Sequence, residues 1–270
     1  MVMELTRGQK SLASTVAYAG GFNRPLYQST IGRPAGMMIG YIWEGNYQYA
    51  DFDNPSPGVY ILKPSVPTNG SPRTSIQPGD IKYKDLNGDG VANDADVTYI
   101  GRGLPIHTGG FSNNFTYKGL SLNVFFQWSY GNDIFNANRL LLEGNSNGYG
   151  YTNQFASYVN RWSPTNQTNE NYRAHGQGPI GDFSSRVVED GSFLRLKTLS
   201  FSYAIPTRFI KGVYLSNLSL NFSAQNLFTW TKYSGMDPEV STRNSVLTPG
   251  YDFSAYPQAR TLVFGLNAAF

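Results

Sequence analysis

The sequence of 270 residues contains no cysteine, few charged residues and no long hydrophobic run. The absence of cysteine excludes disulfides, thiolate metal ligands and cysteine nucleophiles. Charged residues make up 14%, well below the roughly 25% of an average soluble domain, and no run of about 18 apolar residues marks a transmembrane helix. The net charge of +3 is small and no Lys/Arg cluster is interleaved with aromatics, which argues against a nucleic-acid partner.

Aromatic residues and glycine are abundant instead. Aromatics make up 15%, with 19 Tyr and 17 Phe, and 29 of 270 residues are Gly, above the usual share of about 7%. The C-terminal residues show how the apolar residues are arranged, because one face of this stretch holds Leu262, Phe264, Leu266, Ala268 and Phe270. The intervening residues are mostly small or polar. Since side chains alternate along a strand, this pattern predicts a strand with lipid on one side and water on the other.

Alternation and turn residues predict about seven antiparallel strands. They cover residues 9–20, 36–47, 108–117, 120–130, 192–204, 218–231 and 261–270. Lys118-Gly119 predicts a two-residue hairpin turn. Apolar spacing over residues 154–162 predicts a short helix that ends before Pro164.

The connections between these strands differ in length in a regular way. The turn at 118–119 and the connection 205–216 fall at one end of the strands, whereas the long polar segments 48–107, 131–191 and 232–259 fall at the other. In outer-membrane barrels the short turns face the periplasm and the long loops face outward. The sequence therefore predicts an all-β fold: residues 1–270 form the C-terminal portion of a large transmembrane β-barrel with long extracellular loops, in a bacterial outer membrane. Residues 1–10 lack the features of a secretory signal, so we expect the chain to be a piece of a longer exported protein.

Residues 85–96, within the predicted extracellular segment 80–97, fit the twelve-residue calcium loop. That loop needs oxygen ligands at positions 1, 3, 5, 7, 9 and 12 and Gly at position 6. Here the ligands would be Asp85, Asn87, Asp89, the Val91 carbonyl, Asn93 through water, and Asp96 in place of the usual Glu. No helical pattern flanks the loop, so we predict a structural Ca²⁺ site without the EF-hand helices. The alternative is a turn held by Asx side chains bonded to their own backbone.

A second group of candidate site residues consists of aromatics in the long segment after residue 131. They are Tyr149, Tyr151, Phe155, Tyr158 and Trp162. These rings are candidates to stack on sugars or to meet a partner protein; the alternative is that they pack on each other to hold the loop. No catalytic site is predicted, because His107 and His175 lack a nucleophile–base spacing and the adjacent Glu189 and Asp190 point apart, unlike a glycosidase pair.

Five segments resemble one protein family. They are residues 78–90 (Pro-Gly-Asp-Ile-Lys-Tyr-Lys-Asp-Leu-Asn-Gly-Asp-Gly), 110–119 leading into 125–127, 160–164 (Asn-Arg-Trp-Ser-Pro), 225–239 (ending Gly-Met-Asp-Pro-Glu), and 256–261 leading into Phe270. Together they resemble the C-terminal part of the SusC/RagA-type TonB-linked outer-membrane transporters of Bacteroidota.

The resemblance implies the import of oligosaccharides or peptides, powered by the TonB complex. TonB would act through the plug domain and early strands, which have no counterpart in this sequence. It also implies that a SusD-like surface lipoprotein lies over the outer loops. The terminal strand, with Leu262, Phe264, Leu266 and Phe270, is similar to the signal read by the barrel-assembly machinery.

A soluble, secreted β-sandwich that binds carbohydrate or mediates adhesion with calcium is the rival interpretation, because its strands also alternate. The two differ in the surroundings of one set of side chains: Leu120, Leu122, Val124, Phe126, Trp128, Leu262, Phe264 and Leu266. In a sandwich these would be buried against a second sheet, and in a barrel they would face lipid.

Overall fold

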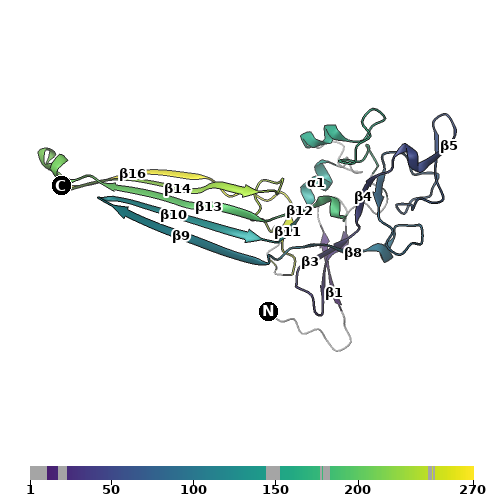
Figure 1. Cartoon of the computed structure of the whole chain (residues 1–270), viewed down its shortest axis with the longest axis horizontal. Coiled ribbons are helices and arrows are strands. Elements are labelled where there is room, and N and C mark those ends of the chain that lie inside the picture. The colour runs from purple at the N-terminus through teal and green to yellow at the C-terminus, as the bar shows by residue number, and fades with distance from the viewer. Residues whose placement is uncertain are drawn as a thin grey trace. The chain divides into compact units, whose positions relative to one another are not determined.

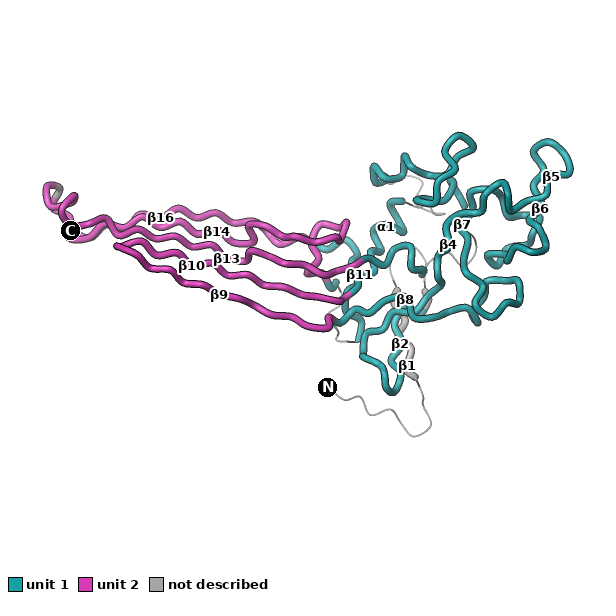
Figure 2. The backbone as a smooth tube through the Cα atoms, viewed as in Figure 1, with its two compact units in different colours: residues 1–104, 133–189, 241–255 teal, residues 105–132, 190–240, 256–270 magenta. Residues whose placement is uncertain are grey.

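The computed structural model describes residues 11–17, 23–143, 153–176, 178, 183–242, 245 and 247–270. This part of the chain is mostly β, with a single short α-helix. None of its helices is long and apolar enough to cross a membrane. The backbone divides into two compact units: residues 1–104, 133–189 and 241–255 form unit 1, and residues 105–132, 190–240 and 256–270 form unit 2 (Figure 2).

Unit 2 is a five-stranded antiparallel sheet with the order β16-β14-β13-β10-β9 (Figure 1). Its strands are β9 (His107–Tyr117), β10 (Leu120–Tyr130), β13 (Phe193–Ala204), β14 (Asn217–Thr231) and β16 (Thr261–Ala269). All five lie where alternation predicts them. The hairpin turn is also confirmed: Lys118 (φ 44°) and Gly119 (φ 82°) are both left-handed, as a type I′ turn requires.

The short connections of unit 2 lie at one end of its sheet and the long ones begin at the other, as predicted. Leu120 pairs with Tyr203, which in turn pairs with Leu220. The turn at 118–119 and the connection 205–216, which contains 3₁₀ turns at Thr207–Phe209 and Lys211–Val213, therefore lie at the same end of the sheet. The chain departs toward 131–191 and 232–260 from the other end.

A β-bulge explains why the alternation in β13 changes phase. The pairing with β10 shifts here, because the consecutive residues Phe126 and Phe125 pair with Leu196 and Thr198, so that Lys197 is the extra residue. A bulge inserts one unpaired residue and resets which face the following side chains occupy. Leu194 and Leu196 before the bulge thus share the face of Leu199 after it.

Unit 1 is built from several small sheets. A four-stranded sheet contains β1 (Ser11–Ala17), β2 (Asn23–Thr30), β3 (Met37–Gly40) and β8 (Thr98–Arg102). Two-stranded sheets pair β4 (Trp43–Asn46) with β7 (Ile81–Tyr83) and β5 (Phe52–Ser56) with β6 (Val59–Leu62). A three-stranded sheet contains β11 (Asp133–Asn136), β12 (Val188–Asp190) and β15 (Tyr251–Asp252). The helices are α1 (Ala137–Leu142) and 3₁₀ turns at Tyr49–Asp51, Asp94–Asp96, Ala156–Asn160 and Ser185–Val187.

Several predictions for unit 1 are wrong. The single strand predicted over 36–47 is two strands, β3 and β4, in different sheets. The break falls at Tyr41, whose N–H donates to the Phe183 carbonyl and whose carbonyl accepts from the Ser185 N–H, so the backbone there pairs with a distant segment. The helix predicted over 154–162 is only the 3₁₀ turn Ala156–Asn160.

The segments 48–107 and 131–191, predicted as loops, carry strands and contribute to three hydrophobic cores. One core is made of Leu26, Tyr27, Met38, Phe135, Ala137, Leu140, Phe183, Val187 and Tyr251. Two smaller ones are Tyr41, Ile81, Tyr83, Ala92 and Tyr172, and Tyr47, Phe52, Leu62 and Ile76. Burying a large apolar side chain contributes about 1.5–3 kcal/mol, which is why these Gly- and Pro-rich stretches hold a fixed structure.

Candidate functional site

The sheet of unit 2 has one strongly apolar face. A single row crosses all five strands, because the pairing places Phe115, Leu122, Phe201, Phe222 and Phe264 side by side. The rings of Phe222 and Phe264 lie 5.0 Å apart. Neighbouring rows along β10, β14 and β16 repeat the pattern with Leu, Val, Phe and Trp side chains.

The exposure of this face decides between a sandwich and a membrane wall. Leu262, Phe264 and Leu266 are 52%, 79% and 64% exposed. In β10, residues Leu120, Leu122, Val124, Phe126 and Trp128 are half-buried. A soluble sandwich requires a second sheet packed on these side chains. The described part of the chain has no such sheet on this face. Leaving such a side chain in water forgoes about 1.5–3 kcal/mol, so the face is suited to an apolar medium.

The opposite face is polar and lined by small side chains. Its side chains include Asn114, Thr116, Ser121, Asn123, Ser200, Ser202, Asn221 and Ser223, which together with Phe115, Leu122, Phe201 and Phe222 line a shallow hollow of about 220 Å³. The Asn123 side chain donates to Asn114 Oδ1 (2.6 Å), and the Ser200 and Ser223 hydroxyls lie 3.4 Å apart. This ladder of hydrogen-bonding groups is suited to water or a polar solute.

A charged cluster holds the segment after β14 on the polar face. The buried Arg195 side chain contacts Asp237 (2.5 Å) and Glu239 (3.0 Å) and donates from Nε to Thr229 (3.0 Å). Lys197, the bulge residue, lies 3.6 Å from Glu239. Each guanidinium nitrogen of Arg195 thus has a partner, which offsets the cost of burying its charge. The Gly-Met-Asp-Pro-Glu segment was noted in the sequence only as a mark of resemblance, so its anchoring role was missed.

The predicted calcium loop closes on itself through backbone N–H groups. Asp85 accepts from the N–H groups of Gly88 and Gly90, each at 2.7 Å. Asp96 is fully buried and accepts from Leu86 and Asn93 at 2.7 and 2.8 Å. These contacts are those of an Asx-held turn.

The centre of the same loop presents amide N–H groups to acceptor oxygens. The Asn87 and Asn93 side chains both donate to Asp89 Oδ2, at 2.9 and 3.0 Å, and Asn93 also donates to the Val91 carbonyl at 3.1 Å. The hydrogen bond from Asn87, followed by those from Val91 and Asn93, lowers the pKa of the Asp89 carboxyl below its usual value. No group of three or more acidic, His or Cys side chains placed to hold a metal occurs in the described ranges.

Three of the five candidate loop aromatics, Phe155, Tyr158 and Trp162, lie within the described residues, and their surroundings differ. Tyr149 and Tyr151 lie outside the described residues. Phe155 is 40% exposed, and the Tyr158 ring lies 5.0 Å beneath the Arg161 guanidinium. Trp162 is buried and its ring lies 5.5 Å from Tyr49, a residue that no local sequence signal indicated.

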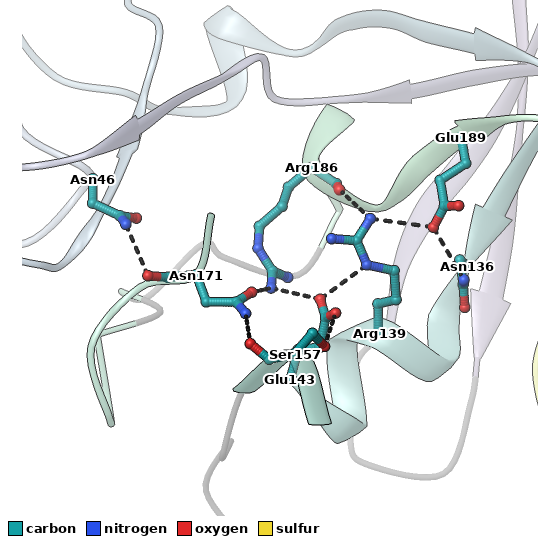
Figure 3. A network of polar contacts seen from close by, with 8 residues as sticks. All are labelled: Asn46, Asn136, Arg139, Glu143, Ser157, Asn171, Arg186 and Glu189. Atoms are coloured by element: carbon teal, nitrogen blue, oxygen red, sulfur yellow. Dashed lines mark hydrogen bonds and ion pairs between the residues drawn. The ribbon is translucent and has the colours of Figure 1, made fainter. Parts of the chain in front are cut away.

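A buried polar network ties the segments of unit 1 together (Figure 3). Its centre is Arg186, whose Nη2 contacts Glu143 Oε2 (2.9 Å) and donates to Asn171 Oδ1. Glu143 also accepts from Ser157 (2.7 Å) and Arg139 (2.9 Å). Burial, the largest effect, lowers the pKa of the Arg186 guanidinium.

The outer part of this network includes Glu189, which accepts from Arg139 (3.2 Å) and Asn136 (3.1 Å). Asn46 joins it from β4 by donating to the Asn171 carbonyl at 2.9 Å. The network thus connects β4, α1, the 153–176 segment and the Ser185–Val187 turn. Glu189 therefore has a structural role in this network.

Comparisons with known proteins give a consistent result. No family model matches the chain. The TonB-dependent receptor P3 of Formosa agariphila is 37% identical over 244 residues, which cover 88% of this chain and 22% of that protein. The TonB-dependent receptor SusC of Bacteroides thetaiotaomicron is 24% identical over 221 residues, 78% of this chain and 19% of that protein.

Solved structures of the RagAB peptide transporter share the fold. One matches with a TM-score of 0.66 at 23% identity and covers 99% of this chain and 25% of that chain. Another, in a closed-closed state, matches with a TM-score of 0.65 at 22% identity. The chain spans a quarter or less of these relatives, which are receptors and a transporter rather than enzymes.

Proposed function

The chain belongs to the SusC/RagA family of TonB-dependent receptors, which are outer-membrane proteins, and we propose that it forms part of the wall of a nutrient importer. The wall encloses a polar path for oligosaccharides or peptides, and energy reaches it through TonB. A SusD-like lipoprotein covers the outer loops. The relatives' names support TonB dependence, and the peptide importers of the same fold support uptake of large solutes.

The observation that carries this proposal is the two-faced sheet of unit 2. Its apolar row, including Phe264 at 79% exposed, suits hydrocarbon, and the Asn, Ser and Thr side chains of the opposite face suit water. A barrel wall needs both surfaces at once. A soluble sandwich needs one of them buried.

The edges of the sheet point to a closed barrel completed by further strands. Among the described residues, β9 and β16 each pair on one side only. Unpaired backbone groups at a lipid-exposed edge cost several kcal/mol each, so membrane sheets close. In the proposed barrel β16, with Leu262, Phe264 and Leu266, serves together with the following Phe270 as the signal for the assembly machinery.

The orientation follows from the connections. The turn at 118–119 and the connection 205–216 face the periplasm, and segments 131–191 and 232–260 face the cell exterior. This matches the rule that the short turns of outer-membrane barrels are periplasmic.

Calcium binding by residues 85–96 is part of the proposal. Asp85, Asn87, Asp89, the Val91 carbonyl, Asn93 and Asp96 would hold the ion, and the support for this is their spacing within twelve residues. On binding, the side-chain amides of Asn87 and Asn93 would rotate. Their N–H groups, which now face Asp89, would turn away, and their carbonyl oxygens would face the ion. The ion would stiffen the loop, since its ligands are hard oxygens at a suitable spacing.

Calcium binding is tested by isothermal titration of the purified chain in detergent with CaCl₂. Asp89→Asn should weaken binding at least tenfold. The matched variant Asp53→Asn, on the exposed β5, should leave binding unchanged. Equal heats for all three proteins would remove calcium from the proposal.

Transport is tested in the native host. Deleting the coding region for this chain should abolish uptake of one class of fluorescently labelled oligosaccharide or peptide, and deletion of TonB should have the same effect. Unchanged uptake of every labelled solute in the first strain would contradict the proposal.

A further inference from the structure

Unit 1 contains a cleft of about 410 Å³ that lies outside the sheet and the calcium loop. Its walls come from three segments that are far apart in the sequence: the 49–60 region, residues 77 and 78, and residues 161–174. We call it the aromatic cleft, because Tyr49, Tyr60 and Trp162 line it together. A concave, aromatic-lined space with a few polar groups is the usual form of a small-molecule site.

The three rings form a curved wall rather than a stack. The Tyr49 and Tyr60 rings lie 5.4 Å apart with planes tilted by 48°, and those of Tyr49 and Trp162 lie 5.5 Å apart with a tilt of 56°. Rings tilted in this way present faces to a ligand instead of covering one another.

The position of Trp162 is fixed before any ligand arrives. Its indole N–H donates to Gln48 Oε1 at 3.0 Å. Its ring lies against Gly79, where any side chain would overlap it and where φ is +90°. A wall held in place in this way loses little conformational entropy on binding.

The cleft is positively charged. Arg161 and Arg173 are among its ten lining residues, and none of the ten is acidic. The charge of Arg173 is paired, because its Nε contacts the buried Asp80 carboxylate at 2.5 Å. Arg161 is exposed, lies over the Tyr158 ring at 5.0 Å, and makes no ion pair in the described part of the chain. Its guanidinium is therefore available to an anionic group, and its planar fork matches a carboxylate.

The backbone of the cleft offers little to a peptide. The N–H groups of Gln77, Trp162 and Ser163 already donate to Asp80, Asn171 and Asn166. The N–H of Arg173 donates to Gly79, and Pro78 and Pro164 have no N–H. Extended peptides are usually bound by adding their backbone to a free strand edge, and Tyr60, in β6, is the one lining residue of the cleft that lies in a strand. Sugar rings instead need flat apolar faces and side-chain hydrogen bonds, which the cleft supplies.

We propose that the aromatic cleft binds an oligosaccharide that carries carboxylate groups, with sugar rings against Tyr49 and Tyr60 and a carboxylate on Arg161. This inference rests on the proposed function, because it names one class of solute for the importer. Its test is separate, because binding at the cleft is measured without transport.

The test is isothermal titration of the purified chain in detergent with tetragalacturonate. Arg161→Gln should raise the dissociation constant at least tenfold for this probe and leave the weak binding of neutral maltotetraose unchanged. Tyr60→Leu should weaken both sugars. Arg208→Gln, an exposed arginine in unit 2, is the matched control and should change neither.

Three results would overturn the proposal: no binding of tetragalacturonate, an unchanged dissociation constant in Arg161→Gln, or equally tight binding of tetraglutamate, which carries carboxylates on a peptide. None of them would contradict the importer, which is judged by uptake in cells.

Discussion

Replacing Glu143 with Gln should destabilise unit 1 more than any exposed charge change does. Glu143 and Arg186 have side chains that are 6% and 1% exposed and lie 2.9 Å apart. Arg186 Nε and Nη1 have no hydrogen-bond partner within the described ranges, and the guanidinium lies 5.1 Å from the Tyr172 ring, so Glu143 supplies the one carboxylate of its ion pair there. Glu143→Gln removes the negative charge and leaves the guanidinium buried.

The magnitude follows from burial. Removing one partner of a buried ion pair costs about 3–5 kcal/mol, because the remaining charge is uncompensated. Glu189→Gln is the matched control: it weakens the contact of Glu189 with Arg139, whose side chain is 22% exposed and which keeps Glu143 as a partner. Pairs near the surface contribute about 0–1 kcal/mol.

The assay is urea unfolding of the purified chain in detergent, followed by protease cleavage within residues 153–176. With a urea dependence of about 1–3 kcal/mol per molar, a loss of about 3 kcal/mol lowers the midpoint by about 1 M or more. The double variant Glu143→Leu/Arg186→Met should recover most of the loss, because a buried pair can be replaced by apolar side chains of similar size. Equal midpoints for Glu143→Gln and Glu189→Gln would refute the reasoning.

Three further predictions concern the sheet, the calcium loop and the aromatic cleft. Leu122→Arg, on the apolar face of β10, should cost about 2–4 kcal/mol of folding free energy in liposomes, whereas Asn123→Arg on the polar face should cost much less; equal costs would contradict the assignment of faces. The folded pKa of Asp89 is lowered, so its stabilisation is complete above the unfolded value of about 3.9 and is lost as pH falls through the folded pKa; protease resistance of its loop should stay constant down to pH ~5 and decline below pH ~4, and a decline near neutrality would be inconsistent. Gly79→Ala should lower the urea midpoint more than Gly58→Ala, since both residues have positive φ but only Gly79 lies against a ring.

The wall of unit 2 could be predicted from the sequence because its signal is local. Alternation along β10, β14 and β16 assigns each side chain to a face, and Lys118-Gly119 fixes the hairpin register. The bulge at Lys197 was not predicted, since the change of phase between Leu196 and Leu199 is visible only when β13 is aligned with β10.

Unit 1 was mispredicted because its order comes from distant contacts. Short strands such as β7 and β15 have too few residues to show a period. The Pro- and Gly-rich stretch around Leu62 folds because Tyr47 and Ile76 bury it. Arg186 likewise shows no local pattern: its partners, Glu143 and Asn171, lie 43 and 15 residues away.

The candidate sites also differ in whether their residues are close together or far apart in the sequence. The predicted calcium loop is contiguous in sequence, so its residues could be listed from their spacing alone. The aromatic cleft joins Tyr49 and Tyr60 to Trp162 across about a hundred residues, and only the last of these was singled out beforehand. Loop aromatics are common, and sequence spacing alone does not show which of them meet.

The most direct measurement is the solvent around alternate residues of β10 in outer-membrane vesicles. The chain has no cysteine, so single cysteines at 121, 122, 123 and 124 can carry a spin label without background. We expect collisions with dissolved oxygen, which concentrates in lipid, to dominate at 122 and 124, and collisions with a water-soluble nickel complex to dominate at 121 and 123. Labels at 122 and 124 that are shielded from both reagents, as in a closed protein core, would contradict the membrane wall.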